Sequence, residues 1–169
     1  MLVVVADASG SMRELGKAMV LRGLLAFIRQ SIEYKTLSSV TADTADSVFV
    51  IWGSSVETHS AVEKLALPRL NPMGRAQVED LLTALEAIEG TSDSFRLLFL
   101  SDGCWSRKLA DCLHKGLSTA RKKFRSQAIA VGSDADMRLL ERIFGRGNVY
   151  LAESALKALS SVPVEVVSR

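Results

Sequence analysis

A short β-branched run that stops at an acid, two serines and a glycine constrains this chain more than any other stretch. Residues 3–6 read Val-Val-Val-Ala, which is continuously apolar and predicts a strand buried on both faces. Asp7, Ser9 and Ser11 follow, and Gly10 permits a tight turn, with Ser11 expected to N-cap the next helix. These polar side chains are therefore expected at the carboxyl end of a central strand, where open α/β sheets bind ligands.

The same polar residues indicate a cation site. A carboxylate and two hydroxyls close together in the chain suit a hard divalent cation that prefers oxygen ligands and keeps some of its waters. A second acid, Asp102, follows the apolar run 96–100 and precedes Gly103. It can serve as a helix cap, but Asp7 and Asp102 at neighbouring strand ends would repel unless a cation or a proton lay between them. We therefore favour a shared site.

The segment Asp7-Ala8-Ser9-Gly10-Ser11 resembles the D-x-S-x-S signature of von Willebrand factor A domains, which opens their metal-ion-dependent adhesion site (MIDAS). The resemblance implies that Ser9 and Ser11 bind Mg²⁺ or Mn²⁺ directly, while Asp7 and Asp102 hold metal-bound waters. It also implies an intracellular protein-binding module. In such a module an acidic side chain of another protein binds the metal ion, and the complex can contain an AAA+ ATPase.

One part of the family pattern is missing. Von Willebrand A domains supply a third hydroxyl from a threonine just after a glycine and before a helix, whereas here Gly74 is followed by Arg-Ala-Gln at 75–77. No threonine occurs in residues 60–82. The missing ligand is expected to weaken metal binding, and the substitutes that the sequence offers are Asn71, Gln77 and Glu79.

Apolar periodicity predicts alternating strands and helices along the rest of the chain. Further strands are expected at 48–52, 56–59, 96–100, 128–132 and 148–151, and helices at 13–34, 78–88, 107–124, 137–144 and 155–159. The run at 56–59 alternates as an antiparallel edge strand would. The pattern predicts one domain over 1–169, with a three-layer α/β/α Rossmann-like fold and a mostly parallel sheet. Its core covers about 2–160, and 161–169 forms a tail or an edge strand.

Composition restricts the classes of function that this chain can have. Apolar residues at 48% and charged residues at 24% are values of a globular domain, and the net charge of +2 favours neither nucleic acid nor a membrane surface. No apolar stretch has the length of a membrane span. Two cysteines, and no basic and apolar leader before the first strand, lead us to expect a cytoplasmic protein without a signal peptide.

Three function classes follow. The first is a protein-interaction module that binds an acidic partner residue through the cation, with Trp105 and residues 68–75 forming the rim. The second is a metal-free scaffold that keeps only the fold. The third is a phosphohydrolase of the haloacid dehalogenase type, which the sequence disfavours because Ser9 stands where that family's acid catalyst would be. We expect no enzyme activity.

Overall fold

A six-stranded sheet forms the centre of the protein, with the strand order β3-β2-β1-β4-β5-β6. The computed structural model describes residues 1–33, 47–60, 70, 72–89, 95–120 and 124–161. Its strands are β1 (Leu2–Asp7), β2 (Ser47–Trp52), β3 (Val56–Ser60), β4 (Phe95–Ser101), β5 (Phe124–Ala130) and β6 (Val149–Leu151). Neighbouring strands pair in parallel except for β2 and β3, which form the predicted antiparallel pair at one edge.

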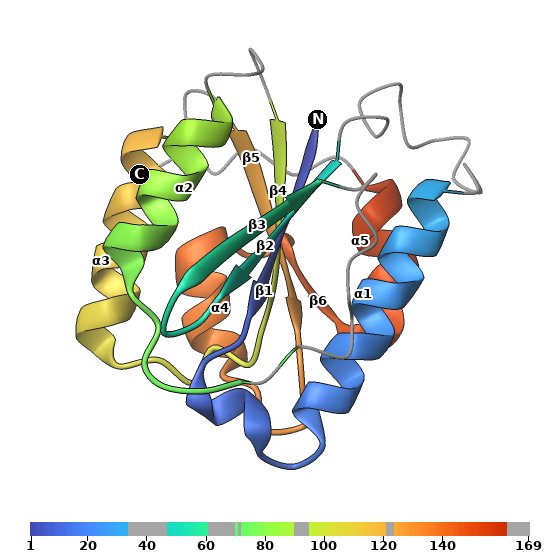
Figure 1. Cartoon of the computed structure of the whole chain (residues 1–169). Helices are drawn as coiled ribbons and strands as arrows, with labels where there is room; N and C mark the ends of the chain where they lie inside the picture. Colours follow the sequence, from blue (N-terminus) through green and yellow to red (C-terminus); the bar gives the residue numbers. More distant parts are fainter. Residues whose placement is uncertain (34–46, 61–69, 71, 90–94, 121–123, 162–169) are drawn as a thin grey trace.

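Helices cover both faces of this sheet (Figure 1). They are α1 (Lys17–Glu33), α2 (Val78–Glu89), α3 (Arg107–Ala120), α4 (Met137–Phe144) and α5 (Ala155–Ser160), with the 3₁₀ turns η1 (Gly10–Arg13) and η4 (Ala152–Ser154). One face packs against α1 and α5, and the other packs against α2, α3 and α4. The predicted three-layer α/β/α fold, mostly parallel with one antiparallel edge strand, is confirmed.

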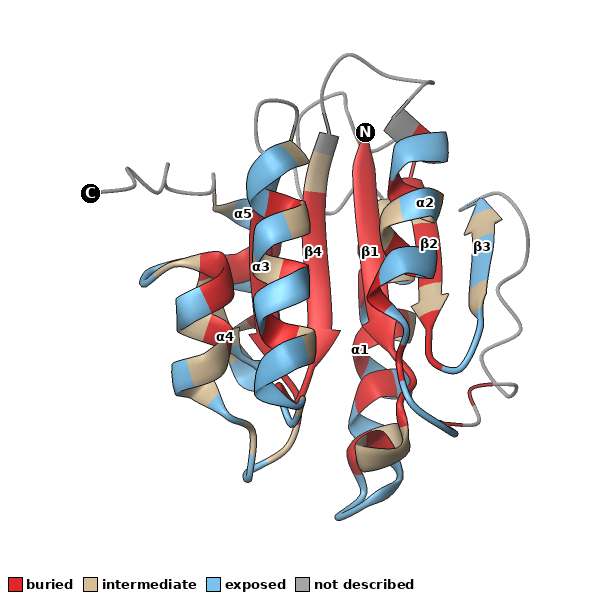
Figure 2. Ribbon diagram, turned by 90° about the vertical axis from the view of Figure 1, so that its left-hand side faces the viewer, coloured by how far each residue is buried: buried red, intermediate tan, exposed pale blue. Residues whose placement is uncertain are grey.

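The central strand β1 supplies side chains to both cores. Val3 and Val5 belong to the cluster under α2, α3 and α4, whereas Val4 and Ala6 belong to the cluster under α1 and α5. Figure 2 shows β1 buried along its length. A strand sandwiched in this way must be apolar at consecutive positions, which is why Val3–Ala6 does not alternate.

Two predicted boundaries were wrong. The helix expected to begin at residue 13 begins at Lys17, because Leu15 and Gly16 adopt left-handed φ angles of 50° and 75° that separate η1 from α1. Ser11 accordingly lies inside η1 rather than capping a long helix. The helix expected to reach 124 ends at Ala120, and Phe124 starts β5.

The early start of β5 depends on buried polar residues. Gln127 donates hydrogen bonds to Ser161 and Tyr150 and accepts one from Arg96, so its amide is satisfied by the neighbouring strands and by the residue after α5. The apolar run predicted as a strand at 128–132 therefore overlapped only the second half of β5. The predicted tail at 161–169 lies, beyond Ser161, outside the described residues. Among the helices that the structure describes, none has both the length and the apolar run that a membrane crossing requires.

Candidate functional site

The structure brings the four predicted site residues together at the carboxyl edge of the sheet, which we define as the edge where the parallel strands end. Asp7 is the last residue of β1, and Asp102 comes directly after β4. Because β1 and β4 are parallel neighbours, their ends lie side by side. Ser9 precedes η1 and Ser11 lies within it, so this turn carries both hydroxyls over the strand ends.

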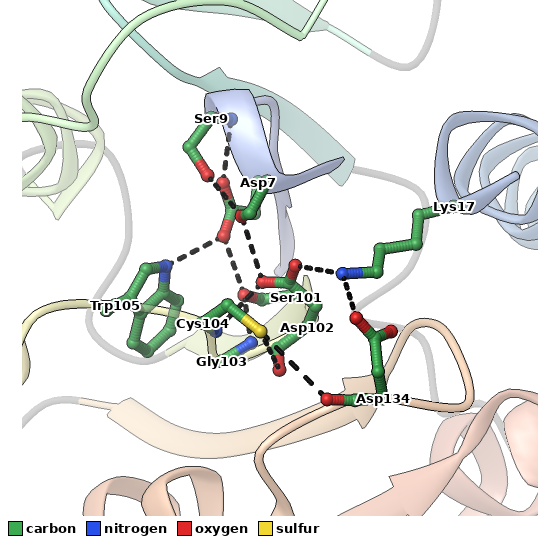
Figure 3. A network of polar contacts seen from close by, with 10 residues as sticks. Asp7, Ser9, Lys17, Ser101, Asp102, Gly103, Cys104, Trp105 and Asp134 are labelled. Atoms are coloured by element: carbon green, nitrogen blue, oxygen red, sulfur yellow. Dashed lines mark hydrogen bonds and ion pairs between the residues drawn. The ribbon is translucent and has the colours of Figure 1, made fainter. Parts of the chain in front are cut away.

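The Asp7 carboxylate is fully buried and is bound by groups of the chain itself (Figure 3). Its Oδ1 accepts the backbone N–H of Ser9 at 2.9 Å. Its Oδ2 accepts the hydroxyl of Ser101 at 2.6 Å and the indole N–H of Trp105 at 2.8 Å. Burial raises the pKa of Asp7 above its ordinary value, and these hydrogen bonds offset part of that rise.

The Asp102 carboxylate is buried to the same extent. Its Oδ1 accepts the backbone N–H of Cys104 at 2.9 Å and the hydroxyl of Ser11 at 3.3 Å. The Ser11 and Ser9 hydroxyl oxygens lie 3.4 Å apart. One connected polar cluster therefore joins the two serines to Asp102.

A fifth residue, Lys17, joins this cluster through Asp102 and was missed by the sequence reasoning, which placed its side chain away from the core. Its Nζ lies 2.8 Å from Oδ2 of Asp102 and 2.8 Å from Oδ2 of Asp134, and the side chain is 1% exposed. Burial lowers the pKa of Lys17, but the two carboxylates outweigh this effect and raise it above its ordinary value. The same contact lowers the pKa of Asp134.

The sequence carried no signal for this role of Lys17. The helix predicted from residue 13 would place Lys17 in its second turn. Only the structure shows that Lys17 is the first residue of α1, at an amino end whose partial positive charge disfavours cations. The position of Asp134, after β5, could not be derived from spacing, because it lies more than a hundred residues further along the chain.

The segment that carries the threonine in von Willebrand A domains also reaches this edge. Met73 donates its backbone N–H to the carbonyl of Ala8, and Gly74 accepts the N–H of Gly10. Ala76 is 3% exposed and belongs to the core cluster under α2. Of the proposed substitute ligands, Gln77 and Glu79 have exposed side chains and Asn71 lies outside the described residues.

These residues fit a divalent cation poorly. All four carboxylate oxygens of Asp7 and Asp102 already accept hydrogen bonds from the chain, and a buried ammonium contacts Asp102. Ala76 has no oxygen in its side chain to replace the missing hydroxyl. Across the described part of the chain, no three His, Cys, Asp or Glu side chains are grouped to hold a metal ion. Metal binding at Asp7, Ser9, Ser11 and Asp102 stays a prediction.

Two residues on the loop after β4 have clear roles. Trp105 lies half-buried, with its ring centroid 5.6 Å from that of Trp52, so it packs inward instead of forming the predicted rim. Burial and the charge of Asp102 raise the pKa of the Cys104 thiol to about 11, which makes it a poor nucleophile at neutral pH.

Comparisons with solved structures identify the fold. The chain is similar to a von Willebrand factor type A protein from Catenulispora acidiphila, with 17% identity and a TM-score of 0.64 over 94% of this chain and 40% of that one. It is similar to manganese-loaded Plasmodium vivax TRAP, with 15% identity and a TM-score of 0.68 over 95% and 72%. An aerotolerance-related membrane protein of Bacteroides fragilis matches at 13% identity and a TM-score of 0.66, over 94% and 95%.

The match to the fold does not extend to the sequence. No family model matches the chain, and no curated protein matches it. Other structural neighbours include a mussel byssus matrix protein with a zinc-occupied MIDAS motif and the pilus adhesin SpaC of Lactobacillus rhamnosus GG. The chain has the fold of von Willebrand factor A domains.

Proposed function

We propose that the chain is a protein-interaction module whose binding face is the carboxyl edge of the sheet. The observation that carries this proposal is the exposure of large apolar side chains on the segments that border the polar cluster. Leu15, Met19 and Met73 are 76%, 73% and 50% exposed. Methionine and other apolar side chains exposed beside a structured polar site are typical of protein-binding surfaces.

The segments that carry these side chains lie next to the polar cluster. The backbone N–H of Met73 is bonded to Ala8, directly before the serines. Leu15 lies between η1 and α1, and Met19 lies in the first turn of α1. A preformed apolar rim loses little conformational entropy on binding, which favours recognition of a protein surface.

The same geometry argues against an enzyme. A strand-end aspartate that attacks a phosphate must be accessible to its substrate. The Asp7 carboxylate is 0% exposed and bound to three donors, and Asp102 is likewise buried against Lys17. The haloacid dehalogenase alternative therefore has no accessible nucleophile among these residues.

Two forms of the interaction module compete. In the metal-dependent form, an acidic residue of the partner completes the shell of Mg²⁺ or Mn²⁺ held by Ser9 and Ser11. The manganese and zinc in two structural neighbours support it. In the metal-free form, apolar contacts supply the affinity, and Lys17 together with Ala76 supports this form. We propose the metal-free form. An AAA+ partner and a cytoplasmic location stay predictions.

A site-resolved cross-linking experiment tests the binding face. A photoreactive amino acid at Met19 should cross-link a defined partner from native lysate, and excess untagged protein should compete with it. The matched position is Leu156, which is 55% exposed on α5 and lies on none of the bordering segments. A partner recovered equally from both positions would contradict the assignment of the face.

Once a partner is known, binding measured with and without chelator distinguishes the metal-dependent form from the metal-free form. Binding that is unchanged by chelator and lost in Met19→Ser, but retained in Leu156→Ser, supports the metal-free form. Binding that disappears in chelator and returns with millimolar Mg²⁺ would establish the metal-dependent form instead.

A further inference from the structure

Lys17 is among the largest fully buried side chains of the described residues. Its ammonium bridges two elements that lie far apart in the sequence, namely the loop after β4 through Asp102 and the loop after β5 through Asp134. Figure 3 shows the side chain extending from α1 toward both carboxylates. The position of the positive charge is thus determined by three segments of the chain.

The buried charge of Lys17 must be compensated, because burial of an ammonium is costly in free energy unless it is paired and hydrogen-bonded. The amino end of α1 adds a further unfavourable interaction. Against this, the carboxylates of Asp102 and Asp134 each lie 2.8 Å from the ammonium. Lys17 therefore supplies the positive charge that compensates these two carboxylates.

A second observation concerns the space around the lysine stem. A Cβ on Gly132 would lie 3.0 Å from Cγ and 3.1 Å from Cε of Lys17, and 2.9 Å from Oδ1 of Asp134. Gly132 also adopts a φ of +99°, which side chains rarely tolerate. The turn after β5 is therefore shaped to hold both the lysine stem and its second carboxylate.

A third observation comes from the opposite side of the edge. The resemblance to von Willebrand A domains leads us to expect a metal-binding hydroxyl just after Gly74, but residues 75–77 are Arg-Ala-Gln, and Ala76 is buried in the core cluster under α2. This side of the edge therefore offers no hydroxyl at residues 75–77, and an ammonium lies on the other side.

We propose that the Lys17 ammonium replaces the divalent cation, so that the carboxyl edge of this protein is assembled without a metal. This inference concerns the same edge as the proposed function, but it stands independently of whether that edge binds a protein. Lys17 is a positioning residue here, because its ammonium fixes Asp102 and the turn that carries Asp134 and does not itself reach the surface.

The wild-type protein provides the first test. We expect the same unfolding midpoint in chelator, in millimolar Mg²⁺ and in millimolar Mn²⁺. We also expect that Mn²⁺ produces no selective paramagnetic broadening of the Ser9, Ser11 and Gly103 amide signals in NMR spectra. A midpoint that rises with either metal, together with selective broadening at these amides, would overturn the proposal.

Variants provide the second test. Lys17→Met keeps the length of the stem but leaves Asp102 buried and uncompensated, and breaking a buried ion pair in this way should lower the folding equilibrium constant by about a hundredfold. Lys17→Met/Asp102→Asn removes both charges and should recover part of this loss. Lys115→Met makes the same substitution at an exposed position of α3 and should have little effect.

The same variants can also contradict the proposal. If Lys17→Met is as stable in chelator as the wild type, the ammonium does not hold the edge together and the proposal is wrong. The comparison uses chelator throughout, so it does not depend on a partner. If the wild-type protein binds no partner at this edge, but the variants change stability as expected, the proposed function is rejected and this inference stands.

Discussion

The indole Nε1 of Trp105 lies 2.8 Å from Oδ2 of Asp7, so the tryptophan of the loop after β4 seals the carboxylate at the end of β1. The ring of Trp105 then packs against Trp52, which is fully buried. Trp105 is therefore part of the support of the site and not part of its rim. This arrangement also explains why Asp7 has no exposed surface.

Trp105→Phe keeps an aromatic ring but removes the hydrogen-bond donor. Asp7 would lose one of three donors while remaining buried, and we expect a destabilisation of about 1 to 3 kcal/mol. Urea unfolding, followed by circular dichroism at neutral pH, measures the effect. An unchanged midpoint would mean that Ser101 and the Ser9 backbone satisfy the carboxylate on their own.

The sequence predicted the fold well because its signals were local. The continuous apolar strands, the alternating edge strand and the amphipathic helices each follow from the side-chain period of one segment. The predictions were wrong where tertiary contacts override that period. Gln127 interrupts an apolar run, yet it lies in the middle of β5 because Arg96, Tyr150 and Ser161 satisfy its amide.

The grouping of the four candidate residues could be predicted for the same reason. Asp7, Ser9 and Ser11 are close in the sequence, and Asp102 follows a strand that had to lie in the same sheet. The ammonium of Lys17 could not be found by apolar periodicity, because that method treats every charged side chain on a helix as solvated. Its partner Asp134 lies on a third loop, and only the folded chain shows that this loop reaches α1.

Gly132→Ala tests the packing around the lysine stem. The new methyl group would meet Lys17 and Asp134 at about 3 Å, and the positive φ adds backbone strain, so we expect a loss of about 1 to 3 kcal/mol. Gly23→Ala is the matched control, because Gly23 lies in α1 with nothing within 4 Å of an added Cβ. It should stabilise the protein by about 0.5 to 1 kcal/mol. Equal effects of the two substitutions would contradict the tight fit at Gly132.

The contact between Lys17 and Asp134 should make stability depend on pH in the acid range. The pKa of Asp134 is lowered in the folded state from its ordinary value of 3.8, so its contribution is present above that value and is lost as the pH falls through the folded pKa. The stability difference between the wild type and Asp134→Asn should therefore shrink as the pH falls from neutral through the lowered pKa of Asp134.

Urea midpoints measured across this range check the prediction. Asp111→Asn serves as the control, because Asp111 forms an exposed ion pair with Arg142 and surface pairs contribute little. A difference between wild type and Asp134→Asn that stays constant down to the acid limit would show that the carboxylate does not favour its charged form beside Lys17.

Ala76→Thr separates the effect of the missing hydroxyl from the effect of the lysine. The sequence alone predicts that this substitution tightens metal binding. With Lys17 on Asp102, we expect Ala76→Thr by itself to leave Mn²⁺ binding undetected, and we expect Lys17→Met/Ala76→Thr to bind Mn²⁺, because only the double variant removes the ammonium and supplies the oxygen. Titration of free Mn²⁺ by electron paramagnetic resonance measures this binding.

The control is Lys17→Met/Ala76→Val, which has nearly the same shape without the hydroxyl and should bind Mn²⁺ less tightly. Mn²⁺ binding by Ala76→Thr alone would show that the threonine, and not the lysine, decides whether this edge holds a metal.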